Sequence, residues 1–552
     1  VDRFFPELNA NALDKQWMQN FGDNAGAQLK EWAAQSPLNA AALRGDTAMY
    51  DVERTLQELH RTLVHHAANK AVVTAKQTIS GMGGVGKTTL TLEYAWKYCS
   101  EYSARLYVKA DSRSSLRQNL AELAGTLKIA TSENLEEQYQ AVLNWLHTNA
   151  RWLLILDNVD TEDAEHAVLD LLPQLNKGHV LITSRRTTWS ETTEQIELDV
   201  LSASAAVDFL LDRTVRKRSA TATDDNDAAT LARLLGYLPL ALEQAGAFIA
   251  RNAISFADYL QRWQSREQKV LGWNKNLLNR YDHSVLTTWA VTFDQLAPDG
   301  QGILHLLCWL APDPILVDLI KKQTPAPGAD PIDSESGILN LVDFSFLKRS
   351  EDKQSVIMHR LVQEIAQHLL PQETRLSWLQ RSLQMLNDFC VGKPQDVRTW
   401  PTIYRPAQPH LTHILPVADN AGIAHPTSRL MIVLAVYAQQ RADFAAAEPL
   451  YRRALSIYET SYGPDHPTVA TSLNNLAALL RDTNRLTEAE SLYRRAVEIL
   501  VLFTARTGHE HPHLGVVLGN YRVILGELGL SESATESRLR ELLQPLNPEK
   551  PE

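Results

Sequence analysis

The stretch that decides the fold is Gly81-Met82-Gly83-Gly84-Val85-Gly86-Lys87-Thr88, which satisfies the pattern G-x-x-x-x-G-K-[ST]. It comes directly after a short apolar run at residues 78–80 and directly before a helical pattern at residues 89–98. Glycines let a backbone wrap a phosphate with its N–H groups, and the N-terminus of the following helix adds a favourable dipole. The stretch therefore predicts a phosphate-binding loop, and a glycine turn with an incidental lysine is the alternative.

The residue types in this loop assign the predicted roles. Lys87 would reach the β- and γ-phosphates of a nucleotide, and the Thr88 hydroxyl would ligate Mg²⁺. We therefore expect ATP or ADP with Mg²⁺ as the bound group. The loop residues expected to contact the nucleotide are Gly81, Gly83, Gly84, Val85, Gly86, Lys87, Thr88 and Thr89.

A second motif is an apolar run at residues 152–156 that ends in Asp157. An acid in this position lies at the carboxyl edge of a parallel sheet, beside the phosphate site, so Asp157 is the predicted Mg²⁺-side acid and a catalytic residue together with Lys87. A turn aspartate after a buried strand is the alternative. The next residue is Asn158, whose amide cannot accept a proton from water, so fast hydrolysis is not expected.

A third motif is the run Val180-Leu181-Ile182-Thr183-Ser184-Arg185-Arg186, a strand pattern that ends in polar residues and arginine. The guanidinium of Arg185 could form a forked, charge-assisted contact with a γ-phosphate. Arg185 is therefore predicted to contact the nucleotide and to act in catalysis, with a solvated surface arginine as the alternative.

The order of apolar patterns along the chain predicts several domains. From residue 76 to about 200, short apolar runs alternate with helical stretches, which is typical of a parallel sheet covered by helices on both faces. Helical spacing dominates after Val200, and polar residues separate two apolar ends between Leu347 and Met358, which is a winged-helix layout. Residues 391–416, rich in proline and aromatic residues, read as a connector.

The C-terminal third contains an internal repeat. The run Ala447-Glu448-Pro449-Leu450-Tyr451-Arg452-Arg453-Ala454 recurs, with one changed residue, from Ala489 to Ala496, an offset of 42 residues (489 − 447). Later features recur at an offset of 45, and we place the insertion in the loop near residues 503–507. Helix pairs of this kind bury their alanine, leucine and tyrosine positions by stacking, so they predict a solenoid with a concave binding face.

These motifs together resemble a known family. The loop at 79–90, the strand at 153–159, Thr183-Ser184-Arg185, and Gly236-Tyr237-Leu238-Pro239-Leu240-Ala241 follow one another as in NB-ARC domains of STAND signalling NTPases. That class includes plant resistance proteins, apoptosome scaffolds and bacterial NLR-like proteins. The repeats resemble the tetratricopeptide repeats of the kinesin light chain type. The resemblance implies an α/β P-loop NTPase domain with a parallel sheet, followed by a helical domain, a winged-helix domain and an α-solenoid.

The resemblance implies roles for two further residues. Pro239 matches the GLPLA proline, which lies against the nucleotide base in that family, although by itself it marks only a helix break. Met358-His359-Arg360 resembles the MHD motif, whose histidine contacts the β-phosphate of ADP in the resting state. An ordinary, partly buried histidine is the alternative for His359. Arg360 replaces the usual aspartate, which leaves the role of that position open.

The expected domain boundaries follow from these patterns. They are an N-terminal helical segment or linker at 1–50, a P-loop domain at 51–200, a helical domain at 201–284, a winged-helix domain at 285–375, a helical connector at 376–427 and a repeat sensor at 428–552. Residues 14–33, in the first segment, read as an amphipathic helix, and residues 51–65, at the start of the P-loop domain, read as a second helix.

Composition limits the compartment and the partners. The net charge of −11 makes nucleic acid an unlikely partner, and no apolar run approaches the ~18 residues of a membrane span. The three cysteines, Cys99, Cys308 and Cys390, lie far apart, which fits a reducing, cytoplasmic compartment. The chain opens at Val1 without a signal pattern, so we expect it to be the remainder of a longer protein with an upstream effector.

The predicted function is an ATP/ADP-dependent switch. By resemblance, a protein or peptide ligand would bind the repeats, and the active form would oligomerise and activate an upstream TIR-like enzyme, nuclease, protease or membrane-perturbing module in immune or antiphage signalling. One alternative is a STAND-type transcription regulator with an upstream DNA-binding domain. Another is a dedicated ATPase, which turnover near ~10 s⁻¹ would indicate.

Overall fold

The computed structural model describes residues 46–546 except 69–75, 81–85, 130–131, 185, 187–188, 190–193, 199, 216, 271–287, 290, 326–330 and 351. The predicted helix at residues 14–33 lies outside the described residues. The chain divides into two compact units, which we describe separately. One unit runs to Leu304 and includes Ile332–Leu369, and the other contains His305–Pro331 and Leu370–Glu552.

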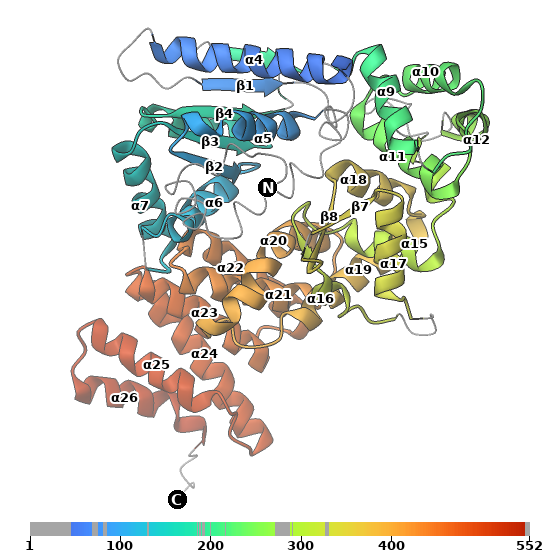
Figure 1. Ribbon diagram of the computed structural model, residues 1–552. Coiled ribbons are helices and arrows are strands. Elements are labelled where there is room, and N and C mark those ends of the chain that lie inside the picture. The colour runs from blue at the N-terminus through green and yellow to red at the C-terminus, as the bar shows by residue number, and fades with distance from the viewer. Residues whose placement is uncertain are drawn as a thin grey trace, which may run out of the picture. The chain divides into compact units, whose positions relative to one another are not determined.

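A five-stranded parallel sheet forms the centre of the first unit, as the sequence predicts (Figure 1). Its order is β2-β3-β4-β1-β5. The strands are β1 (Lys76–Ser80), β2 (Ala104–Lys109), β3 (Trp152–Asp157), β4 (His179–Thr183) and β5 (Glu194–Glu197). Strand β5 was not predicted, because its sequence Glu-Gln-Ile-Glu contains one apolar residue; it lies at an edge of the sheet, where less apolar surface is buried.

Helices cover both faces of this sheet. Every residue of β3 is buried, and its side chains alternate between two hydrophobic clusters. Trp152, Leu154 and Leu156 pack with residues of α6, α7 and α8, whereas Leu153 and Ile155 pack with residues of α4 and α5. This is why the strand reads as a continuous apolar run. The covering helices are α4 (Asp46–Ala68), α5 (Lys87–Lys97), α6 (Arg113–Thr126), α7 (Leu135–Thr148) and α8 (Glu162–Leu171), with short turns η2 (Cys99–Glu101) and η3 (Leu172–Gln174).

A group of helices and a β-hairpin follow the sheet within the first unit. The helices are α9 (Ala203–Thr214), α10 (Asp224–Leu234), α11 (Pro239–Asn252) and α12 (Phe256–Val270), then α17 (Ser334–Asp343) and α18 (Arg360–Leu369). Strands β7 (Leu347–Arg349) and β8 (Ser355–Met358) pair antiparallel, at the place where the sequence indicated a hairpin. The turn before β7 is bonded to α11, since the Gln244 side-chain amide donates to the Ser345 carbonyl at 2.5 Å.

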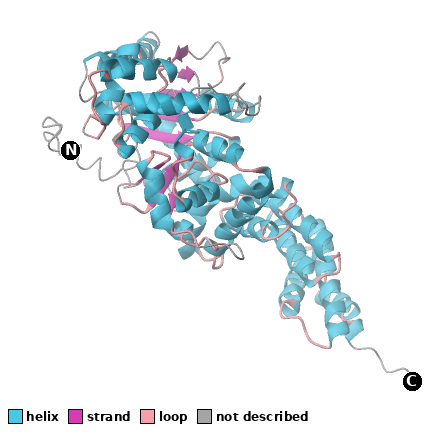
Figure 2. Ribbon diagram, turned by 90° about the vertical axis from the view of Figure 1, so that its right-hand side faces the viewer, coloured by secondary structure: helices cyan, strands magenta, loops and turns pink. Residues whose placement is uncertain are grey.

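Helix α15 (Pro298–Leu307) leads into the second unit, which consists mainly of helices. Before the repeats it contains β6 (Ile315–Leu316), α16 (Val317–Ile320), α19 (Gln372–Phe389), η4 (Val397–Thr399), a π-helical turn η5 (Trp400–Tyr404) and α20 (Arg405–Asn420). The segment read as a proline-rich connector is thus largely helical, with Pro409 and Pro416 inside α20. In Figure 2 the described C-terminal part of this unit is drawn as cyan helices joined by pink loops.

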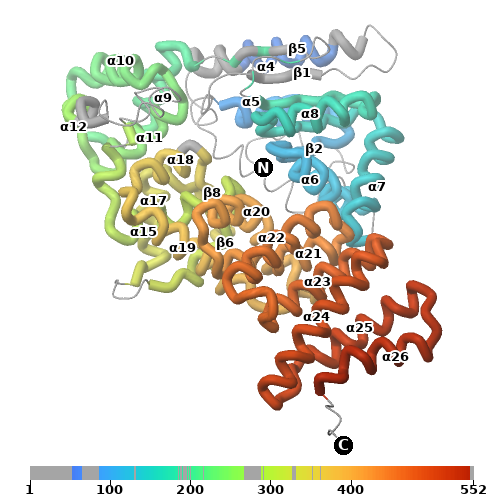
Figure 3. Tube along the Cα trace, turned by 180° about the vertical axis from the view of Figure 1, so that it is seen from behind, coloured from blue at the N-terminus to red at the C-terminus, as the bar shows by residue number. Residues whose placement is uncertain are grey.

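Stacked antiparallel helices form the repeat region (Figure 3). They are α21 (Thr427–Gln440), α22 (Phe444–Tyr462), α23 (Pro467–Asp482), α24 (Leu486–Thr507), α25 (Leu514–Glu527) and α26 (Glu532–Leu542), followed by η6 (Gln544–Leu546). Equivalent residues of the two copies, including Tyr451 and Tyr493, are buried in one hydrophobic cluster. The insertion predicted in a loop instead lengthens a helix, because α24 has 22 residues where α22 has 19.

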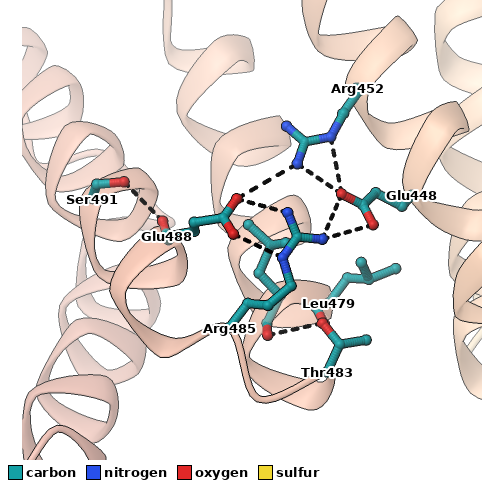
Figure 4. A network of polar contacts seen from close by, with 8 residues as sticks. Glu448, Arg452, Leu479, Thr483, Arg485, Glu488 and Ser491 are labelled. Carbon is teal, nitrogen blue, oxygen red and sulfur yellow. Dashed lines mark hydrogen bonds and ion pairs between the residues drawn. The ribbon is translucent and has the colours of Figure 1, made fainter.

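An ion-pair network connects successive repeats on the surface (Figure 4). Arg485, which precedes α24, donates to Glu448 of α22 at 2.8 Å and to Glu488 of α24 at 2.7 Å. Arg452 also donates to Glu448. Such exposed pairs contribute little stability individually, and here they link α22 with α24. Among the described residues of the whole chain, no helix has both the length and the apolar character of a membrane span.

Candidate functional site

The N-terminus of α5 carries the last residues of the glycine-rich loop. Gly86 caps this helix with φ of 103°, a left-handed conformation that favours glycine, and its carbonyl accepts from the Leu90 N–H at 2.9 Å. Lys87 is 7% exposed, and Thr88 and Thr89 are half-buried. The predicted contacts Gly81, Gly83, Gly84 and Val85 lie outside the described residues. Where the structure describes the loop, it leads directly into a helix N-terminus.

Asp157 lies beside Thr88 although 69 residues separate them in the chain. The Thr88 hydroxyl donates to Asp157 Oδ1 at 2.8 Å, and the carboxylate is 1% exposed. The Thr183 hydroxyl donates to the same oxygen at 2.5 Å, and the Tyr107 hydroxyl donates to Oδ2 at 2.8 Å. Three hydroxyl groups from three elements therefore hold one buried carboxylate, which offsets the cost of burying its charge.

This arrangement fits the oxygen ligands that Mg²⁺ prefers. A threonine hydroxyl and a carboxylate at hydrogen-bond distance form a hard-donor pair, and Mg²⁺ is usually held by one or two protein oxygens together with phosphates and waters. Lys87 immediately precedes Thr88 in the first turn of α5, so the sequence places an amino group next to this hydroxyl–carboxylate pair. The donor set is therefore consistent with a metal–nucleotide site at this edge of the sheet.

The backbone conformation after Asp157 favours asparagine at position 158. Its φ is 67°, in the left-handed region that asparagine tolerates better than most residues. Its N–H donates to the Thr183 hydroxyl at 2.9 Å, and its carbonyl accepts from the Asp160 N–H at 2.8 Å. The chain thus turns sharply after β3 and holds Asp160 at the same edge of the sheet.

The arginine motif is described in part. Arg185 lies outside the described residues, so its predicted contact with a γ-phosphate stays a prediction. Arg186 is described, and its Nε lies 2.6 Å from Glu165 of α8. The Ser184 hydroxyl donates to the Val159 carbonyl at 2.5 Å and accepts from the Arg186 N–H. This network fixes the end of β4 to the turn that follows Asp157.

Pro239 is the first residue of α11 and is buried. Proline suits this position, because the N–H it lacks would have no partner within the helix. Gly236 and Tyr237 before it both have positive φ, at 58° and 55°, which makes a tight turn into the helix. The Tyr237 carbonyl accepts from the Leu201 N–H at 3.2 Å. The motif therefore begins a helix beside the end of the sheet domain.

His359 is exposed and comes immediately before α18, where its carbonyl accepts from the Val362 N–H at 2.9 Å. The neighbouring Arg360 forms an ion pair with Asp160, 200 residues earlier in the chain. The structure thus brings residues 359–360 close to the turn after Asp157.

Sequence patterns did not identify Tyr107, Thr183 or Asp160 as members of this site. Tyr107 lies on β2 in register with Ile155 of the neighbouring strand, two residues before the acid. Thr183 ends β4, and its place in a polar run at the sheet edge was the available signal. No sequence signal pairs Asp160 with Arg360.

Family models match three parts of the chain. An NB-ARC domain matches residues 52–220, a domain of unknown function (DUF7779) matches residues 291–375, and a tetratricopeptide repeat matches residues 426–500. The first match covers β1 to β5 and includes Lys87, Thr88 and Asp157. The third covers the helices α21 to α23 and most of α24.

Curated relatives are similar over part of their length. A nucleotide-binding leucine-rich repeat (NLR)-like protein of Hyaloscypha variabilis is 26% identical over 434 residues, which are 72% of this chain and 42% of that protein. The regulatory protein AfsR of Streptomyces coelicolor is 28% identical over 50% of this chain and 27% of its own length. The chain thus spans less than half the length of these relatives.

Among solved structures, a STAND protein with a tetratricopeptide repeat sensor from Pyrococcus horikoshii aligns with 89% of this chain and 76% of its own. That match has 15% identity and a TM-score of 0.40. The family models and the sequence relatives carry the assignment. The chain therefore joins an NB-ARC nucleotide-binding domain to C-terminal tetratricopeptide repeats, and it is a homologue of an NLR-like protein.

Proposed function

We propose that this chain is a molecular switch whose state depends on whether ATP or ADP is bound. The observation that carries the proposal is the hydrogen bond between Thr88 and the buried Asp157, at the start of the helix that Lys87 begins. A lysine and a hydroxyl at one helix N-terminus, with a carboxylate bonded to that hydroxyl, suit a nucleotide phosphate group with Mg²⁺. The bound Mg²⁺ would neutralise phosphate charge there.

The residue roles in this proposal come from the motifs and from the family resemblance. Lys87 binds the β- and γ-phosphates, and Thr88 and Asp157 hold Mg²⁺. Arg185 reads the γ-phosphate, Pro239 packs against the base, and His359 reads ADP. The loop residues Gly81, Gly83, Gly84, Val85, Gly86 and Thr89 complete the contacts. Each nucleotide shifts the equilibrium only through contacts that differ between the two states.

Slow hydrolysis is part of the proposal. Asn158 stands where a second carboxylate would activate water, and an amide cannot take up the proton. The nearest following acid, Asp160, is paired with Arg360. Hydrolysis then serves as a reset of the switch, in contrast to the rapid turnover of a dedicated ATPase.

The repeats are the proposed sensor. Stacked helix pairs present an extended surface, and an unidentified protein or peptide would bind it and favour the ATP state, in which the chain self-associates. By the resemblance to NLR-like proteins, we propose that the output of the switch is defence signalling. Three free cysteines, two of them buried, are consistent with a cytoplasmic location, and the net charge of −11 disfavours nucleic acid as the sensed ligand.

A second candidate is a role in transcriptional regulation with a DNA-binding domain upstream. The similarity to regulatory protein AfsR favours it. Both candidates use the same nucleotide site and differ in the output, so a DNA-binding assay of the full-length protein would separate them.

The proposed nucleotide site is tested by measuring ADP binding calorimetrically for wild type, Lys87→Ala and Lys97→Ala. Lys97 is the matched control, because it ends the same helix and is paired with Glu53. We expect Lys87→Ala to abolish binding and Lys97→Ala to retain it. Tight ADP binding by Lys87→Ala would contradict the assigned site.

A further inference from the structure

Arg360 and Asp160 form a cross-domain ion pair at the phosphate end of the sheet. Arg360 is the first residue of α18, in the segment of the winged-helix motif, and Asp160 follows β3 by three residues. The side chain of Asp160 is 9% exposed and that of Arg360 is 24% exposed. Neither charge is fully solvated, so the pair is screened less than a surface pair.

The position of Asp160 is fixed by its surroundings. Its N–H donates to the Asn158 carbonyl at 2.8 Å, and Asn158 in turn donates to the Thr183 hydroxyl that holds Asp157. A short, bonded turn thus connects the acid that pairs with Arg360 to the acid beside Thr88. The pair therefore fixes the start of α18 at the proposed nucleotide edge.

The other side of the winged-helix segment is attached differently. Ser345 donates to Glu243 of α11 at 3.0 Å, and Glu243 also accepts from Arg213 of α9. Arg251 of α11 lies 3.1 Å from Asp343. The winged-helix segment is thus bonded to the helical domain near Ser345 and to the sheet domain through Arg360.

From these contacts we infer that Arg360 is a positioning residue: its ion pair with Asp160 closes the winged-helix segment over the phosphate edge and sets His359 there. The expected effect on ADP release rests on the proposed function. The closure itself does not require a bound nucleotide. The guanidinium and the carboxylate are both part of the protein, so the contact persists when the nucleotide leaves. The intact pair keeps the winged-helix segment at the phosphate edge and so slows ADP release, and breaking the pair should speed that release.

A charge-swap experiment on the full chain tests the inference. The variants are Arg360→Asp, Asp160→Arg and the double swap, with Arg349→Asp as matched control, because Arg349 pairs with Glu335 inside the winged-helix segment. Two readouts are needed. One is the release rate of fluorescently labelled ADP, and the other is hydrogen exchange of the α18 amides in nucleotide-free protein, which does not depend on nucleotide binding.

We expect each single swap to raise both rates on the order of tenfold, and the double swap to return both to within about threefold of wild type. Arg349→Asp should leave both near wild type. A double swap no better than the product of the single effects would overturn the inference. If the swapped variants fail to fold, a double-mutant cycle with the uncharged variants Arg360→Gln and Asp160→Asn replaces them. If the two residues are paired, Asp160→Asn should change neither rate further once Arg360→Gln is present.

The two readouts separate this inference from the proposed function. If the Arg360 and Asp160 substitutions show no energetic coupling in hydrogen exchange while ADP still binds through Lys87, only the ion-pair closure is refuted. Coupling in hydrogen exchange without any ADP binding would refute the nucleotide switch and leave the closure standing.

Discussion

Replacing Tyr107 with phenylalanine removes one hydroxyl from the Asp157 carboxylate and leaves the aromatic ring in place. In the structure Oδ1 accepts from Thr88 and Thr183, and Oδ2 accepts from Tyr107 at 2.8 Å. The substitution leaves Oδ2 of a carboxylate that is 1% exposed without a donor among the described residues. Hydrogen bonds to charged groups contribute about 1.5–3 kcal/mol, so we expect the free energy of unfolding to fall by about that amount.

The same substitution should weaken the proposed metal site. An Asp157 carboxylate freed on one side is less well oriented, so we expect the Mg²⁺ concentration needed for binding of a non-hydrolysable ATP analogue to rise by about an order of magnitude. Metal-free ADP binding should change little, because it depends on the loop and Lys87.

The assay combines urea denaturation with a Mg²⁺ titration of analogue binding. Tyr139→Phe is the control, since its ring lies over Arg117 and no hydrogen bond to its hydroxyl is formed among the described residues. If Tyr107→Phe stays within about 0.5 kcal/mol of wild type and keeps its Mg²⁺ dependence, the hydroxyl does not hold Asp157 and the reasoning is wrong.

Two further substitutions test other parts of the molecule. The equivalent repeat tyrosines differ, because the Tyr451 hydroxyl donates to Gln439 at 2.9 Å and the Tyr493 hydroxyl is buried without a partner among the described residues. We expect Tyr451→Phe to lower the free energy of unfolding by about 1 kcal/mol and Tyr493→Phe to leave it unchanged or raised; equal losses would refute this. Burial raises the pKa of Glu93 on α5 to about 7, above its ordinary 4.5, so the folded state holds this proton more tightly and loses stability as pH rises from 4.5 to 7. Glu93→Gln should therefore stabilise the protein by about 1–2 kcal/mol at pH 8 and little at pH 4, and equal denaturation midpoints at pH 8 would contradict it.

The sequence predicted the sheet because burial on both faces leaves a clear pattern. β3 is apolar from Trp152 to Leu156, because alternate side chains meet helices on opposite faces of the sheet. The loop before α5 needs glycine at Gly86 for its positive φ, and such constraints are visible in residue types. Strand β5 escaped prediction because an edge strand with one apolar residue lacks that pattern.

The sequence predicted those residues of the candidate site that belong to a motif of fixed spacing. Lys87, Thr88 and Asp157 follow from motif spacing, and the structure brings Thr88 and Asp157 together. Tyr107 and the pair Arg360–Asp160 join the site through contacts between strands and domains, which no local pattern records. Arg185, His359 and Pro239 keep their proposed roles as predictions.

The switch itself is tested most directly by sedimentation of the full chain with ADP and, separately, with Mg²⁺ and a non-hydrolysable ATP analogue. Lys87→Ala serves as the control, because it should respond to neither nucleotide. The account predicts a single slow-sedimenting species with ADP and a larger, faster-sedimenting assembly with the ATP analogue. Identical sedimentation of the wild-type chain with both nucleotides, at saturating concentrations of each, would contradict it.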